Sequence, residues 1–137
     1  MPDCILRVWG PTRTVRTFLS RTTLKPCATF FKGEPITPAS SRLSRRSGFN
    51  LLVSRADGDL PAQCRDALIY LRGNANEMAA IHSAFGAGHA QLDFGLWDIS
   101  SENIPWPRFT LSHKLVAEAG RYGLELELSF YGPPGGE

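Results

Sequence analysis

The sequence predicts a single α+β domain: a mainly antiparallel sheet of about five strands with helices packed on one face. Two observations predict it. Short β-branched and aromatic runs alternate with segments of helical period, in the order β-α-β-β-α(α)-β-α-β. The run 124–131 (LELELSFY) alternates apolar and polar residues, which is typical of an antiparallel sheet with one face open to water. At 137 residues and 42% hydrophobic, the chain can bury one core without a metal or disulfide staple.

The first third of the chain predicts a strand, a helix and a second strand. Residues 4–9 (CILRVW) are apolar with β-branched and aromatic members, and a Gly-Pro turn follows them. Thr12 or Thr14 can then cap a short helix that Pro26 ends. The apolar face of this helix has helical spacing and consists of Val15, Phe18, Leu19 and Thr22. Residues 27–31 (CATFF) form the second strand, and we expect the polar segment 34–47 to be a mobile loop.

The middle third predicts a strand followed by two helical stretches. Residues 48–54 (GFNLLVS) form the strand, and an Asp-Gly turn follows it. Asp59 begins a helix with Pro61 in its first turn. The apolar stripe of this helix consists of Leu60, Cys64, Ala67, Leu68 and Leu71. A second stretch begins at Asn76, and we expect four of its side chains to share one apolar face: Met78, Ile81, His82 and Phe85.

The last third predicts a strand, a helix and a closing strand. Residues 89–99 (HAQLDFGLWDI) alternate for much of their length, which indicates a half-buried strand. Thr110 or Ser112 caps the last helix, and Gly123 stands where a glycine commonly ends one. Residues 124–131 form the closing strand. The domain therefore covers residues 1–131, and residues 132–137 (GPPGGE) form a flexible tail.

The two ends of the chain have similar patterns. Each contains a strand with a tryptophan near its end, a helix, and a strand that closes on an aromatic residue and a glycine. The pattern suggests two strand–helix–strand halves that arose by duplication.

Charge is unevenly distributed along the chain. Residues 1–47 contain nine basic and two acidic residues, whereas residues 48–137 contain six basic and eleven acidic ones, for a net charge of +2. Such asymmetry can indicate an anionic partner. It can also disappear once the two halves interleave in the fold, and we favour that second interpretation.

No familiar catalytic or metal-binding pattern is present. No serine lies in a G-x-S-x-G elbow, and the three histidines have no metal-ligand spacing. Asp93 and Asp98 are expected on opposite faces of their strand, so they do not form an acid–base pair. The three cysteines match no zinc pattern, and we expect them to be small buried hydrophobes. The sequence therefore predicts no cofactor, no metal and, on balance, no enzyme, although an unrecognised active site stays open.

Several short segments carry a resemblance to a known family. They are residues 32–34 (KGE), 47–49 (SGF) at a strand entry, the helix around 68–71, 109–112 (FTLS) before a helix, and the closing 128–131 (LSFY). The chain resembles, over residues 3–131, a family of small uncharacterised bacterial α+β proteins catalogued as a domain of unknown function. Phe49 stands where another aromatic residue, such as tryptophan, is usual. The resemblance implies the fold and a bacterial source, and it implies no activity and no catalytic residues.

Two loops are candidate contact surfaces for a protein partner. One carries Arg42, Arg45 and Arg46, and the other runs from Ile104 to Phe109 and carries Trp106 and Arg108. Tryptophan and arginine are common anchors of protein interfaces. We therefore expect Arg42, Arg45, Arg46, Trp106 and Arg108 to bind the partner.

The leading functional hypothesis is a non-enzymatic protein-binding module. It rests on an analogy with small bacterial α+β proteins that bind and neutralise a toxin, as immunity proteins or antitoxins do. Nucleic-acid binding through the basic N-terminal half is a weaker alternative, because +2 is low for such a binder and no interleaved aromatic residues appear. The N-terminus resembles no signal peptide, and no apolar run is long enough to span a membrane, so we expect a cytoplasmic location. The oligomeric state stays open.

Overall fold

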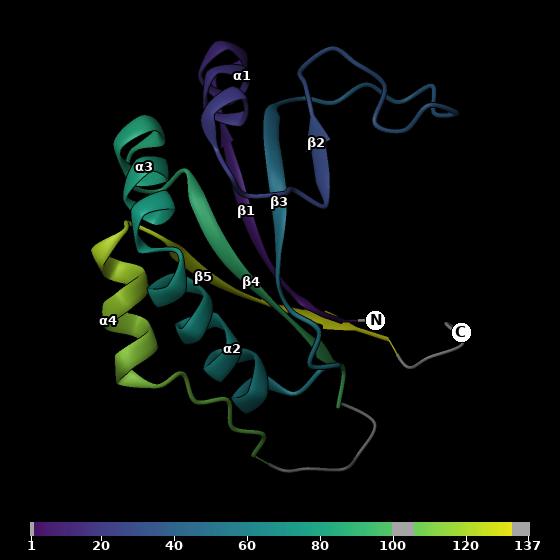
Figure 1. Ribbon diagram of the computed structural model, residues 1–137. Helices are drawn as coiled ribbons and strands as arrows, with labels where there is room; N and C mark the ends of the chain where they lie inside the picture. The colour runs from purple at the N-terminus through teal and green to yellow at the C-terminus, as the bar shows by residue number, and fades with distance from the viewer. Residues whose placement is uncertain (1, 100–105, 133–137) are drawn as a thin grey trace.

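The computed structural model describes residues 2–99 and 106–132. Its sheet has the strand order β2-β3-β1-β4-β5, with strands β1 (Cys4–Gly10), β2 (Ala28–Phe30), β3 (Ser47–Ser54), β4 (Ala90–Trp97) and β5 (Glu125–Tyr131). One face of the sheet is covered by helices α1 (Thr12–Arg21), α2 (Leu60–Gly73), α3 (Ala75–Phe85) and α4 (His113–Arg121) (Figure 1). The predicted α+β fold is confirmed. Of the predicted tail, only Gly132 lies within the described residues.

The sheet is antiparallel at three of its four strand pairs. β1 pairs with β3 and with β4, and β2 pairs with β3, all antiparallel, whereas β4 and β5 are parallel. The two strand–helix–strand ends therefore differ. β4 and β5 are direct neighbours, but β3 is inserted between β1 and β2. The two units are built into the sheet differently, so the fold lends the proposed duplication no support. It stays a prediction from the sequence.

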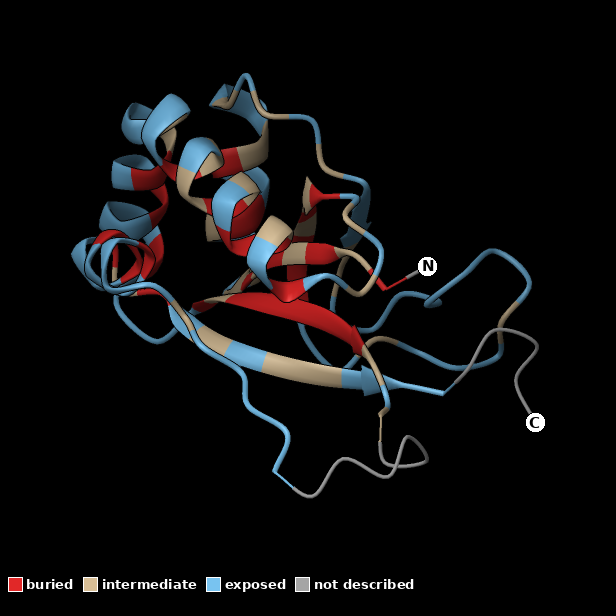
Figure 2. Ribbon diagram, turned by 90° about the horizontal axis from the view of Figure 1, so that it is seen from below, coloured by how far each residue is buried: buried red, intermediate tan, exposed pale blue. Residues whose placement is uncertain are grey.

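The core lies between the helices and the sheet, and three phenylalanines join its elements. Phe49 of β3 stacks on Phe18 of α1 with ring centroids 5.3 Å apart, and it meets Phe85 of α3 edge-on at 6.1 Å. Phe49 has no exposed surface. This cluster holds α1 and α3 against the same strand. Figure 2 shows buried residues where the helices and the sheet face each other.

Side-chain caps begin two of the helices. Asp59 accepts a hydrogen bond from the Ala62 amide, and Ser112 accepts one from the Leu115 amide, as the sequence predicted. The predicted cap of α1 is wrong. Pro11 occupies the N-cap position without a side-chain hydrogen bond, and the hydroxyl of Thr12 instead shares a 2.6 Å hydrogen bond with that of Ser47 on β3.

β4 is more buried than its alternating pattern predicted. Every residue from Leu92 to Leu96 is buried: Arg7 of β1 and Ser129 of β5 bond to Asp93, and Pro2 and Asp3 lie against Gly95. At Gly95 a Cβ atom would lie 2.7 Å from the carbonyl oxygen of Asp3, so only glycine allows this close approach. None of the described helices is long and apolar enough to cross a membrane.

Two side chains expected in the core lie at the surface. His82 is exposed on α3, although its neighbours Met78, Ile81 and Phe85 are buried. A helix 11 residues long packs only a narrow stripe on the sheet, and His82 falls outside that stripe. Cys27 is also exposed, because it precedes the short edge strand β2.

Glu77 ties α3 to the segment that leads into β2. Its carboxylate accepts hydrogen bonds of 2.9 Å from both the amide and the hydroxyl of Thr23. The hydrogen bond from the Thr23 amide is the main reason why the pKa of Glu77 lies below its usual range. This contact stabilises the fold above the carboxylate's unfolded pKa, and its contribution is lost as the pH falls through the lowered value.

The phenylalanine cluster generates the first prediction. We expect Phe49→Ala to lower the free energy of unfolding by about 3–5 kcal/mol, because it removes a fully buried ring that contacts two helices. Urea denaturation measures the loss. Ile69→Ala, at a residue with 64% exposure on α2, is the matched control and should change stability by no more than about 0.5 kcal/mol. Similar losses in both variants would contradict this assignment of the core.

Candidate functional site

Residues 31–46 form an irregular hairpin between β2 and β3, which we call the arginine hairpin. Gly33 donates to the Ser44 carbonyl at 2.9 Å, Ser44 donates to the Glu34 carbonyl at 2.8 Å, and Ile36 donates to the Arg42 carbonyl at 2.9 Å. The sequence predicted a loop here, and the structure gives that loop a backbone ladder. In Figure 1 the hairpin extends away from the sheet beyond its β2 edge.

Contacts at the base hold the arginine hairpin against the domain. The guanidinium of Arg16 on α1 lies 4.1 Å from the Phe31 ring centroid and also forms a 3.2 Å ion pair with Glu34. At the other end of the hairpin, the guanidinium of Arg46 lies 4.6 Å from the ring centroid of Trp9 on β1. Arginine stacked on an aromatic ring is a favourable cation–π contact. The direction of the hairpin is therefore set by α1 and by the central strand.

The hairpin and the helix-free face of the sheet enclose a concavity of about 970 Å³. Its basic side chains come from both sides: Arg7 from β1, and Arg42, Arg45 and Arg46 from the hairpin. The rest of the lining includes Phe30, Ile36, Leu43 and Asn50. No carboxylate belongs to this lining within residues 2–99 and 106–132. The structure thus brings together three of the five residues predicted to bind a partner.

The arginines of the concavity differ in whether they form ion pairs within the chain. Arg42 and Arg45 form no ion pair with any described residue, and both are exposed. Beside them lie two exposed aliphatic side chains, Ile36 at 52% and Leu43 at 54%. Arginine is enriched among the residues that dominate the binding energy of protein interfaces, and exposed aliphatic side chains are apolar area that a partner can cover. This concavity is the best candidate for a binding site.

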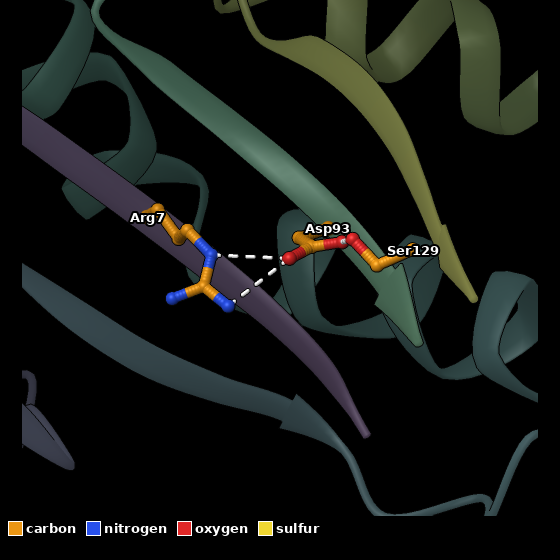
Figure 3. Close-up of polar contacts among 3 residues, drawn as sticks. All are labelled: Arg7, Asp93 and Ser129. Carbon is orange, nitrogen blue, oxygen red and sulfur yellow. Dashed lines mark hydrogen bonds and ion pairs between the residues drawn. The ribbon is translucent and has the colours of Figure 1, made fainter. Parts of the chain in front are cut away.

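Arg7 takes part in a line of hydrogen bonds across the helix-free face (Figure 3). Its Nε and Nη2 donate to Oδ2 of Asp93 on β4 at 3.1 and 3.0 Å, and Ser129 of β5 donates to Oδ1 at 2.6 Å. With its amide oxygen turned toward Arg7, Asn50 of β3 accepts from Nη1 at 3.2 Å. We call these four residues the polar belt.

The hydrogen bonds of the polar belt join neighbouring strands of the sheet to one another. Asp93 is almost completely buried, and donors occupy both of its oxygens. Both carboxylate oxygens are therefore engaged within the chain, Oδ2 by Arg7 and Oδ1 by Ser129. Sequence reasoning missed this cluster, although Arg7 is a single charged residue between two apolar ones on its strand, a pattern that indicates an outward-facing side chain.

The opposite edge of the same face is acidic. Glu125 and Glu127 of β5 are exposed and pair in register with Gln91 and Asp93 of β4. Because paired residues point to the same side of a sheet, both glutamates lie on the face of the polar belt. Neither forms an ion pair with a described residue. The helix-free face is therefore basic at the arginine hairpin and acidic at β5.

The second predicted contact loop lies elsewhere. Trp106 is 79% exposed, and Arg108 lines a smaller cavity of about 510 Å³ near the end of β4. Phe109 packs edge-on against Phe130 at 5.5 Å. Figure 1 shows residues 106–112 at the bottom of the molecule and the arginine hairpin at the top right, so the structure does not join the two loops into one surface. Ile104 lies outside the described residues.

The thiols and histidines do not assemble into a reactive site. Burial raises the pKa of the thiols of Cys4 and Cys64, which disfavours the reactive thiolate. Cys64 is buried in α2, whereas His82 points to solvent on α3. Within the described part of the chain, no three His, Cys, Asp or Glu side chains gather as a metal site would need. Comparison with known protein families, curated proteins and solved structures finds no match to this chain.

The polar belt generates a prediction of stability. We expect Asp93→Ala to lower the free energy of unfolding by about 2–3 kcal/mol, because it leaves both Arg7 and Ser129 without their acceptor. The loss stays below that of a fully buried pair, since Arg7 is 32% exposed and can recover water. Ser129→Ala should cost only about 1 kcal/mol. In the double variant Arg7→Ala/Asp93→Ala, chemical denaturation should give less than the sum of the single losses, and strict additivity would contradict the coupling.

The thiols generate a prediction of reactivity. In the native protein a water-soluble thiol reagent should label Cys27 rapidly, because it is the exposed one of the three free cysteines. Cys4 and Cys64 should react only after unfolding, since they are buried and their thiolates are disfavoured. Mass spectrometry of labelled peptides distinguishes the three sites. Rapid native labelling of Cys4 would show that the central strand is not packed as described.

Proposed function

We propose that this chain is a binding module that takes an acidic protein surface into the concavity of the arginine hairpin. One observation carries the proposal: four arginines and two exposed aliphatic side chains line a single concavity that contains no described carboxylate. Arg42 and Arg45, which form no ion pair with a described residue, supply charge-assisted hydrogen bonds to carboxylates. Ile36 and Leu43 supply apolar area that a protein partner can cover.

The charge distribution of the helix-free face favours a protein over a nucleic acid. A nucleic acid carries negative charge along its whole length, so a strand that crossed this face would meet Glu125 and Glu127 after leaving the arginines. A protein surface can carry both charges and match both edges. Among its described lining residues the concavity holds aliphatic side chains beside a single aromatic ring, that of Phe30, and one ring does not build a stacking platform for bases.

Neutralisation of a toxin is the specific form of this proposal. A protein that covers the active surface of a toxin needs a complementary, well-anchored patch and no catalytic group of its own. The arginine hairpin, fixed at its base by Arg16 and Arg46, supports such a role. Three free cysteines suit a reducing compartment, and we place this binding in the cytoplasm.

The test compares partner capture by charge variants at the two loops. The tagged wild-type chain should enrich a protein partner from cells of its source, and nuclease treatment should leave that enrichment unchanged. The variant Arg42→Glu/Arg45→Glu/Arg46→Glu should bind the purified partner at least about 10-fold more weakly, with reduced salt dependence. Calorimetry measures both quantities. If the partner is a toxin, coexpression of the wild type should restore growth and this triple variant should not.

The matched control changes the other loop. Trp106→Ala/Arg108→Glu should bind the partner as the wild type does, because these residues lie away from the concavity. If this control loses binding while the triple variant keeps it, the site lies at residues 106–109 and the proposal is wrong. Capture that depends on nucleic acid would favour the alternative that the basic N-terminal half binds nucleic acid.

A further inference from the structure

The two edges of the helix-free face carry charges of opposite sign, on opposite sides of the central strand. β1 is the middle strand of five, with β3 and β2 on one side and β4 and β5 on the other. Unpaired arginines, Arg42 and Arg45, lie beyond one edge, and unpaired carboxylates, Glu125 and Glu127, lie on the other. The positive and the negative ends are thus arranged on opposite sides of one central line.

We propose that the chain forms a homodimer in which two helix-free faces pack together around a two-fold axis parallel to β1. Rotation by 180° about such an axis places the β2 edge of one copy over the β5 edge of the other. Each arginine hairpin then faces the glutamates of the second copy, and the contact occurs twice by symmetry. A two-fold axis across the strands would place like charges together, so the charges select the first arrangement.

The shapes of the two edges suit this arrangement. The arginine hairpin rises from the sheet and leaves the 970 Å³ concavity beside it. β5 is an edge strand whose exposed glutamates can enter that concavity from the second copy. The acidic strand also discourages sheet extension through the edges, because two β5 strands side by side would repel each other.

The centre of the face can be buried without an unpaired charge. Arg7 and Asp93 neutralise each other within one chain, so neither charge would be buried unpaired in the dimer. Ile5 and Leu52 are paired across β1 and β3, and both are half-buried and available for apolar contact. The dimer centre therefore combines a neutral polar belt with a small aliphatic patch.

The area of the face suffices for a dimer of modest affinity. Four strands of seven or eight residues and the three-residue β2, at about 4.8 Å spacing and about 3.3 Å per residue, give a face of about 520 Å². Two such faces bury about 1,000 Å², which is near the lower bound for specific interfaces. We expect a dimer dissociation constant in the micromolar range. This inference does not depend on the proposed partner, but the partner and the second copy would compete for the same arginines.

The experiment uses charge reversal and exchange on the purified full chain. Sedimentation equilibrium from about 1 to about 200 µM at low salt should show a monomer–dimer equilibrium for the wild type, shifted to monomer by added salt. Arg42→Glu/Arg45→Glu and Glu125→Arg/Glu127→Arg should each raise the dimer dissociation constant at least about 10-fold. Mixing the two variants should restore dimers, because each hairpin then faces an edge of opposite charge in both contacts.

Controls separate this contact from a general effect of charge. Arg72→Glu/Lys114→Glu reverses two exposed charges on the helical side, and it should leave the dimer unchanged. Circular dichroism confirms that each variant is folded. The variant with all four edge reversals should again form a homodimer, which repulsion from net charge would not produce.

Three outcomes would overturn the inference: a wild type that stays monomeric throughout this range, a dimer insensitive to both edge reversals, or a mixture that stays monomeric. A monomeric wild type that captures an acidic protein through the arginine hairpin would overturn the dimer and leave the proposed function standing. A dimer that captures no protein partner would support the dimer and overturn the proposed function.

Discussion

Arg7 of β1, the middle strand, and Asp93 of the neighbouring strand β4 form an ion pair on the face that no helix covers. Asp93 is almost completely buried there, and an isolated carboxylate in such a place would cost several kcal/mol. The pair, with Ser129 and Asn50 at its ends, satisfies these polar groups within the chain. The middle of the face is therefore neutral, and its free charge lies at the two edges, where a partner can reach it.

The order of the strands decides where those edges are. β3 lies between β1 and β2, so the connection from β2 to β3 is made at the outer side of the sheet. The arginine hairpin in this connection stands over the helix-free face, anchored by Trp9 and Phe31. On the other side, the parallel return through α4 makes β5 the second edge and exposes its glutamates. One topology thus produces both the concavity and the bipolar face.

Much of the fold could be predicted because its signals are local. The caps at Asp59 and Ser112 and the order of strands and helices depend on residues a few positions apart, and the structure confirms them. The errors concern residues whose surroundings come from distant segments. Thr12 bonds to Ser47 instead of capping its helix, and His82 and Cys27 lie at the surface. β4 is buried on both faces because Arg7 and Ser129 cover Asp93.

The candidate site shows the same division. By itself the sequence determined the α+β class, the order of elements and the presence of an arginine-rich segment between two strands. It could not show that Arg42, Arg45 and Arg46 share a concavity with Arg7, or that Trp106 and Arg108 lie away from it. Periodicity reveals which face a side chain takes, but the neighbours across a sheet depend on strand order. Only the tertiary structure decided that the basic hairpin and the acidic β5 strand lie at opposite edges of one face.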